Sequence, residues 1–188
     1  MRLFTLKLLC VLSCALSACS GAARPAPEYL DAQTGATVAH VRAPIIFARA
    51  HADVAANARQ YSNLVVVRIN RSGRYEYLLL VYNWTTVDPR LGAGRRPGDT
   101  LLLLADERLI RLPRDSRSLH EAGLERPPLR PLHYRGPPWL YVVSEDELQF
   151  IADARRLRLQ FDADPDKRPF DIWQDGRRAL AGLVAGAN

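Results

Sequence analysis

The chain has 188 residues, of which 26 are Lys or Arg and 20 are Asp or Glu, so its formal net charge at pH 7 is +6. This length is enough for one domain with a sizeable buried core. All three cysteines fall between positions 10 and 19, which excludes a small fold held together by internal disulfides. The apolar run near the start is far shorter than the roughly 20 residues of a membrane-spanning helix.

The N-terminus has the layout of an export signal. Arg2 and Lys7 precede an apolar run at 8–16, and this run ends in the sequence Leu16-Ser17-Ala18-Cys19. A basic start, a short apolar core and small residues near the cut are typical of a secretory signal peptide. The four residues at 16–19 resemble the lipobox of bacterial lipoproteins. The alternative is an ordinary signal peptide with a coincidental cysteine.

The lipobox resemblance implies cleavage before Cys19 and attachment of fatty acyl chains, such as palmitate, to the Cys19 sulfur and the new amino group. Two or more acyl chains anchor a protein stably to a membrane. Ser20 follows the cysteine where many inner-membrane lipoproteins have Asp, so the resemblance implies the outer membrane, with the domain facing the periplasm.

Three segments are therefore expected along the chain. Residues 1–18 are the signal peptide, 19–27 the lipidated cysteine and a small, Pro-containing spacer, and 28–188 one globular domain. Cleavage removes two basic residues and no acidic one, which leaves a net charge of +4 on 170 residues. An exported and tethered chain is not expected to meet nucleic acid.

The first part of the domain alternates short β-rich runs with turns. Residues 31–35 read as a turn, and Pro44 separates two predicted short strands at 37–41 and 45–48. The Ala-rich segment 51–59 predicts one or two helical turns, with Asp53 as a candidate N-terminal cap.

The centre of the predicted fold is a long antiparallel hairpin. Two β-rich runs at 61–70 and 75–86 flank the polar turn 71–74, in which Gly73 suits a left-handed conformation. Both faces of the second run are apolar over part of its length, which predicts a central strand covered on both sides.

The second half predicts another hairpin, a long Pro-rich loop at 113–138, and a mixed C-terminal third. Ser144 and Glu147 form a capping box for a helix over 145–154, and Asp175 is a candidate cap for a last helix over 179–184. The other elements expected here are strands at 100–104, 108–112, 139–143, 157–161 and 170–173. Together the elements predict the α+β class, with a mostly antiparallel sheet that is sandwich-like or curved and two short helices in the C-terminal third.

No pattern in the mature chain is typical of a catalytic or metal centre. The histidines are not spaced as metal ligands, and the chain lacks zinc-type Cys pairs, a nucleophile elbow and a phosphate-binding Gly-rich loop. His51 and Asp53 are close enough to orient a general base, but no nucleophile accompanies them. Asp162, Asp164 and Asp166 alternate as in a calcium loop, but a proline interrupts them and no closing Glu follows. We therefore expect no cofactor, no metal and no enzymatic activity.

Two residue sets are candidates for binding. Arg108, Arg111, Arg114 and Arg117 recur every third residue. With the arginines of the following loop they predict a cationic surface for an envelope protein or an anionic lipid. A solvated strand edge that discourages aggregation is the alternative. The second set, Tyr77, Tyr82 and Trp84, predicts an apolar groove on the long hairpin, with a place in the core as the alternative.

The mature sequence is similar to small uncharacterised envelope lipoproteins of proteobacteria, a resemblance that assigns no functional residue. The leading hypothesis is a membrane-anchored, non-enzymatic scaffold or binding subunit, which requires a contiguous surface patch near the Arg-rich loop. The first alternative is a periplasmic binder of a small apolar or lipid ligand, which requires an enclosed cavity lined by Tyr77, Leu79, Tyr82 or Trp84. A hydrolase with a dispersed site is the second alternative.

Overall fold

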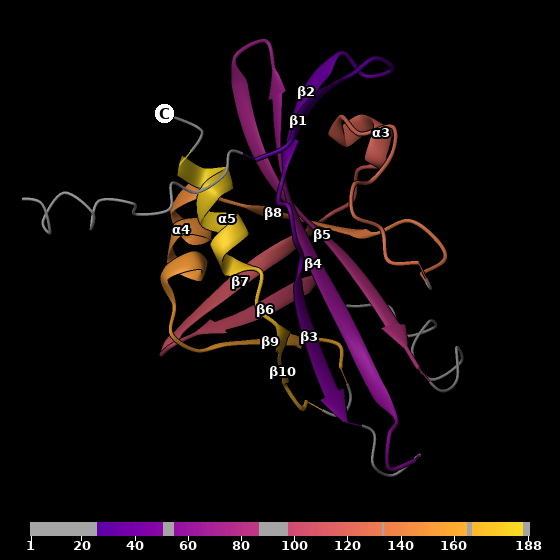
Figure 1. The fold of residues 1–188 in the computed structure, drawn as a ribbon, viewed down its shortest axis with the longest axis vertical. Coiled ribbons are helices and arrows are strands. Elements are labelled where there is room, and N and C mark those ends of the chain that lie inside the picture. Colours follow the sequence, from indigo (N-terminus) through magenta and orange to yellow (C-terminus); the bar gives the residue numbers. More distant parts are fainter. Residues whose placement is uncertain (1–25, 51–54, 87–97, 133, 165–166, 186–188) are drawn as a thin grey trace, which may run out of the picture.

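The structure is a computed structural model that describes residues 26–50, 55–86, 98–132, 134–164 and 167–185 (Figure 1). Cys19, the signal peptide and most of the expected spacer lie outside these residues, as do His51, Asp53 and Asp166. The predicted helical turns at 51–59 are described only from residue 55, where the chain makes a turn and then enters a strand.

The described residues form ten strands and three short helices. The strands of the first half are β1 (Glu28–Asp31), β2 (Ala36–His40), β3 (Ile45–Ala50), β4 (Arg59–Arg71) and β5 (Arg74–Thr85). The strands of the second half are β6 (Thr100–Ala105), β7 (Arg108–Asp115), β8 (Trp139–Val143), β9 (Leu157–Phe161) and β10 (Phe170–Gln174). The helices are α3 (Leu119–Ala122), α4 (Glu145–Asp153) and α5 (Arg177–Ala185).

Eight of the strands close into an antiparallel barrel. The strand order β4-β3-β10-β9-β6-β7-β8-β5 returns to β4, because β4 and β5 pair along their whole length. The expected α+β class with a sandwich-like or curved sheet is therefore wrong: the fold is nearly all β, and its sheet closes. Closure depends on pairings between segments far apart in the chain, such as β3 with β10 and β5 with β8. The alternation of hydrophobic residues indicates which face of a strand is buried, but it does not indicate which strands pair.

The long hairpin is confirmed as the centre of the fold. Its turn has left-handed φ values at Ser72 (53°) and Gly73 (84°), as a two-residue turn between twisted strands requires. β3 pairs with the first half of β4, whereas β2 pairs with the second half. β1 and β2 therefore extend the sheet beyond the barrel, alongside the projecting tip of the hairpin (Figure 1).

The inside of the barrel is filled by side chains. Inward-facing residues include Phe47, Leu79, Leu103, Tyr141 and Phe170, each at most 1% exposed. An eight-stranded barrel is about wide enough for its interior to be filled in this way. The interior is thus a packed hydrophobic core.

α4 and α5 pack against each other across one end of the barrel (Figure 1). α4 begins as expected, because Ser144 and Glu147 form the predicted capping box. α5 begins at Arg177, two residues before the expected 179, and the Asp175 carboxylate accepts a hydrogen bond of 3.0 Å from the Arg177 backbone N–H. No helix among the described residues has the length and apolar character to cross a membrane.

The predicted long loop after β7 lies against the outside of β4 and β5. It contains α3, with a capping box of Ser118 and Glu121 that was not predicted. The Glu125 backbone N–H donates to the buried Asp31 carboxylate at 2.8 Å, and the Tyr82 hydroxyl donates to the Pro128 carbonyl at 3.3 Å. This loop covers the second face of the central hairpin, as the apolar pattern on both faces of β5 indicated.

Candidate functional site: an arginine-lined groove

A surface groove of about 450 Å³ lies between the barrel wall and the end of the long loop. One wall is the end of β7 and the start of β8, and the other is residues 134–138. We call it the arginine groove. Its lining includes three arginines and two aromatic residues, which are Arg114, Arg117, Arg135, Tyr134 and Trp139. The loop that forms it lies on the side of the barrel away from α4 and α5 (Figure 1).

Arg114 and Trp139 form the end of the groove nearest the barrel. They lie on neighbouring strands, and the Arg114 guanidinium carbon is 4.1 Å from the centroid of the Trp139 ring. A guanidinium on an indole face is held by a cation–π contact. Among the described residues, no carboxylate lies within salt-bridge distance of Arg114 or Arg135. These two side chains thus bring positive charge to the groove.

Arg117 has a different role, because two carboxylates surround it. It donates to Glu76 and to Asp115, the latter at 2.6 Å. Burial alone raises the pKa of Asp115, but the hydrogen bonds and charge of Arg117 outweigh it and hold this pKa below its ordinary value. The same contacts raise the pKa of Arg117. This ion-pair cluster joins β5 to the start of the loop and leaves Arg117 neutralised.

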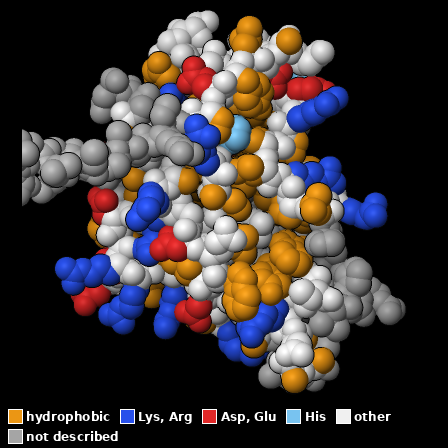
Figure 2. Space-filling view, in the orientation of Figure 1, with side chains coloured by type: hydrophobic (Ala, Val, Ile, Leu, Met, Phe, Trp, Pro, Cys, Tyr) orange, Lys and Arg blue, Asp and Glu red, His pale blue; other side chains and the backbone are white. Residues whose placement is uncertain are grey.

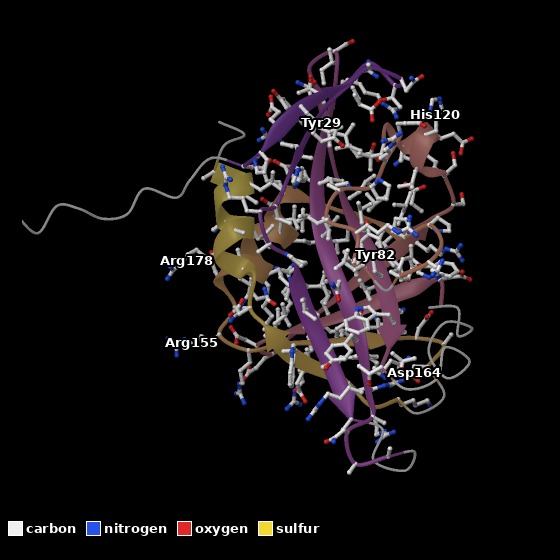
Figure 3. All side chains as sticks on the ribbon, turned by 45° about the vertical axis from the view of Figure 1, so that its right-hand side comes forward. Tyr29, Tyr82, His120, Arg155, Asp164 and Arg178 are labelled. Atoms are coloured by element: carbon white, nitrogen blue, oxygen red, sulfur yellow. The ribbon has the colours of Figure 1, made fainter. Side chains whose placement is uncertain are left out.

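The outer wall of the groove is fixed by polar and aromatic contacts. The Tyr134 hydroxyl donates to the Pro137 carbonyl at 2.8 Å, and Arg130 donates to the Tyr134 carbonyl at 2.9 Å. The Tyr134 ring meets that of Tyr82 edge to face, with centroids 5.0 Å apart. Burial raises the pKa of both phenols. Figure 3 shows Tyr82 at the centre of the molecule, on the hairpin that supports the loop. The wall is therefore held in place without a ligand.

The structure does not bring the four predicted arginines onto one surface. Arg108 lies at the opposite end of β7, 4.8 Å from the ring centroid of Phe150 in α4. Arg111 is exposed on the outer face of β7, whereas Arg114 and Arg117 line the groove. A spacing of three places successive residues on opposite faces of a strand, because strand side chains alternate with period two.

The three residues of the predicted apolar groove are also separated. Tyr77 is buried on the inner face of β5, next to Arg68, whereas Tyr82 and Trp84 lie on the outer face. Tyr82 lies under the long loop, and Trp84 stacks on Tyr61 with centroids 4.3 Å apart. The three side chains therefore do not line one cavity.

Sequence reasoning missed the loop half of the arginine groove. Tyr134, Arg135 and Trp139 come together only because the loop folds back along β8. The available signals were the loop's length and the sequence Ser118-Leu119-His120-Glu121, a capping-box pattern that marks a short helix.

The described residues contain no group of three or more potential metal ligands. His120 lies 3.7 Å from Glu125, with both side chains at least half exposed. Asp164, one of the alternating aspartates, instead forms a buried ion pair with Arg49.

No protein-family model, curated protein or solved structure matches this chain, so its function is inferred from its own residues.

Proposed function

We propose that this protein is a non-enzymatic binding subunit of the bacterial envelope that holds an acidic segment of a partner protein in the arginine groove. In this proposal acyl chains on Cys19 anchor it to the outer membrane, with the domain in the periplasm. The anchor and the location are supported by the lipobox resemblance alone. The binding role is supported by the groove.

The observation that carries the binding role is the charge of the groove. Arg117 is neutralised by Glu76 and Asp115, but Arg114 and Arg135 have no carboxylate partner among the described residues. Unopposed guanidinium groups favour carboxylate or phosphate ligands, with which they form paired hydrogen bonds. An acidic side chain in the groove would meet both.

The aromatic lining favours a protein segment over a lipid headgroup. Trp139 and Tyr134 flank the arginines, and Leu119, Pro137 and Pro138 add apolar surface. Trp, Tyr and Arg are the residue types that contribute most to binding energy at protein interfaces. The recess is also walled on two sides, whereas a flat bilayer surface would meet only its rim.

The fixed outer wall supports affinity. A binding site that is already ordered loses little conformational entropy when its ligand arrives. The contacts of Tyr134 with Pro137, Arg130 and Tyr82 provide this order.

The experiment is a calorimetric titration with an octaglutamate peptide, in the untethered Cys19→Ala form for solubility. We expect Arg114→Gln with Arg135→Gln to weaken binding about tenfold or more, because two charged hydrogen-bond donors are lost. Arg108→Gln with Arg111→Gln is the matched control: it also removes two positive charges, both from β7 and both outside the groove. Equal effects of the two changes would show that the peptide responds to net charge and would contradict the proposal.

A further inference from the structure

A second groove, independent of the arginine groove, lies on the outer wall of the barrel, over the neighbouring strands β4, β3 and β10. Its volume is about 490 Å³. Its floor contains the small residues Ala48 and Ala50, and around them stand Arg59, Arg168, Asp171 and Trp173. We call it the tryptophan groove. Figure 2 shows hydrophobic side chains gathered over the lower part of this face, with Lys and Arg side chains directly below them.

Trp173 is presented to solvent by an irregularity in β10. The register between β10 and β3 shifts between Ile172 and Gln174, which places Trp173 at the shift. Such bulges re-aim a side chain relative to a regular strand. Trp173 is 56% exposed, a large value for an indole on the wall of a barrel.

Trp173 continues a row of aromatic rings that three strands, β5, β4 and β10, contribute. Trp84 and Tyr61 are stacked with centroids 4.3 Å apart, and Tyr61 meets Trp173 edge to face at 6.0 Å. β3 runs between Tyr61 and β10, and its residue at this point is Ala48, which pairs with Tyr61 on one side and with Asp171 on the other. A larger residue there would separate the rings. The contact between these rings therefore depends on the small residue Ala48 in β3.

Charged groups border the exposed ring. The Arg59 guanidinium carbon is 4.9 Å from the Trp173 ring centroid. Asp171 accepts a hydrogen bond of 3.0 Å from Arg158, so its charge is compensated. Among the described residues, no carboxylate lies within salt-bridge distance of Arg59, so this guanidinium leaves the groove with an excess of positive charge.

We propose that the tryptophan groove binds an acidic glycan. A sugar ring packs the C–H groups of one face against an aromatic ring, and its hydroxyl groups pair with planar guanidinium and carboxylate groups. The groove offers the exposed Trp173 indole, the Arg59 guanidinium and the Asp171 carboxylate around a floor of alanines. The excess positive charge selects sugars that carry a carboxylate.

The shape of the groove argues against a peptide as its occupant. Peptide anchors such as Leu or Phe are held in well-packed pockets that enclose them. Here the floor is formed by the small side chains of Ala48 and Ala50, and the rings of Trp84, Tyr61 and Trp173 lie in a row and do not enclose a pocket.

The test is a calorimetric titration of the Cys19→Ala form with tetragalacturonate, with neutral maltotetraose as the matched probe. Tetragalacturonate should bind, and maltotetraose should bind about tenfold more weakly or not at all. Trp173→Ala should weaken tetragalacturonate binding about tenfold or more. Arg59→Gln should weaken it by a similar factor while maintaining the thermal unfolding temperature, which separates lost binding from lost folding.

Trp139→Phe, in the arginine groove, distinguishes the two sites and should leave tetragalacturonate binding unchanged. The proposal is overturned if the wild-type domain does not bind tetragalacturonate, or if maltotetraose binds equally well. It is also overturned if Trp139→Phe abolishes binding while Trp173→Ala does not. A failure of tetragalacturonate to bind the wild-type domain leaves octaglutamate binding unaffected, so the two proposals can fail separately.

Discussion

Arg49 of β3 and Asp164 form a buried ion pair, and removal of one partner should destabilise the fold strongly. Their side chains are only 5% and 4% exposed. Arg49 also donates to the Gln60 side-chain carbonyl at 2.7 and 2.9 Å and lies 4.4 Å from the Phe170 ring centroid. Figure 3 shows Asp164 at the end of the barrel opposite α5. The pair thus joins β3 and β4 to the turn that follows β9.

The magnitude follows from burial. Asp164→Asn leaves a guanidinium in the interior without its counter-charge, which costs about 3–5 kcal/mol of unfolding free energy. For a domain of this size each kcal/mol lowers the unfolding temperature by about 2–4 °C, so we expect a decrease of roughly 6–20 °C. Arg49→Met combined with Asp164→Leu leaves no charge buried at this site and should lie within about 2 kcal/mol of the wild type.

Urea unfolding followed by circular dichroism measures these differences. The matched control is Asp171→Asn, which breaks the Arg158–Asp171 ion pair at a site where the side chains are 55% and 71% exposed. That change should cost less than about 1 kcal/mol. A loss for Asp164→Asn as small as that of the control would refute the reasoning, because the Arg49 charge would then have access to water.

Three further changes test other parts of the account. Hydrogen bonds from Glu125, Thr34 and Gln33 hold the pKa of the buried Asp31 carboxyl below its ordinary value of 3.8. These hydrogen bonds therefore stabilise the folded state fully above about pH 3.8, and this stabilisation is lost as the pH falls through the lowered pKa. Asp31→Asn should therefore cost about 2 kcal/mol at pH 7 and progressively less below about pH 4, and a pH-independent difference would contradict this. Tyr82→Phe removes the hydrogen bond to Pro128 and should cost about 1 kcal/mol and speed amide exchange in the loop; unchanged exchange would show that the bond does not hold the loop. Cys19→Ala should abolish labelling by radioactive palmitate and release the protein from the outer-membrane fraction, and retention there would contradict the proposed anchor.

Most elements were predicted because their signals are local. Expected strands at 139–143 and 157–161 match β8 and β9, and the capping box of Ser144 and Glu147 placed the start of α4 correctly. The hairpin of β4 and β5 was predicted from the apolar runs and the turn at Gly73. Each of these features is determined by neighbours within a few residues.

Barrel closure and the arginine groove were not predicted, because both depend on distant contacts. β3 pairs with β10, which lies more than a hundred residues later in the sequence, and the residue pattern of neither strand indicates which strand it pairs with. Pro113 indicated the end of a strand, yet β7 continues to Asp115. Pro113 is the last residue that pairs with β6, and Arg114 is the first that pairs with β8. A proline is tolerated at such a change of partner, because it leaves few ladder hydrogen bonds to lose.

The chain has three tryptophans, which makes one nuclear magnetic resonance experiment the most direct test of the arginine groove. Trp139 lies in that groove, whereas Trp84 and Trp173 belong to the aromatic row on the outer wall. On titration with octaglutamate, the indole N–H signal of Trp139 should shift as Arg114 turns toward the carboxylates, while the other two signals stay in place. Shifts of Trp84 or Trp173 without a shift of Trp139 would contradict the proposed site.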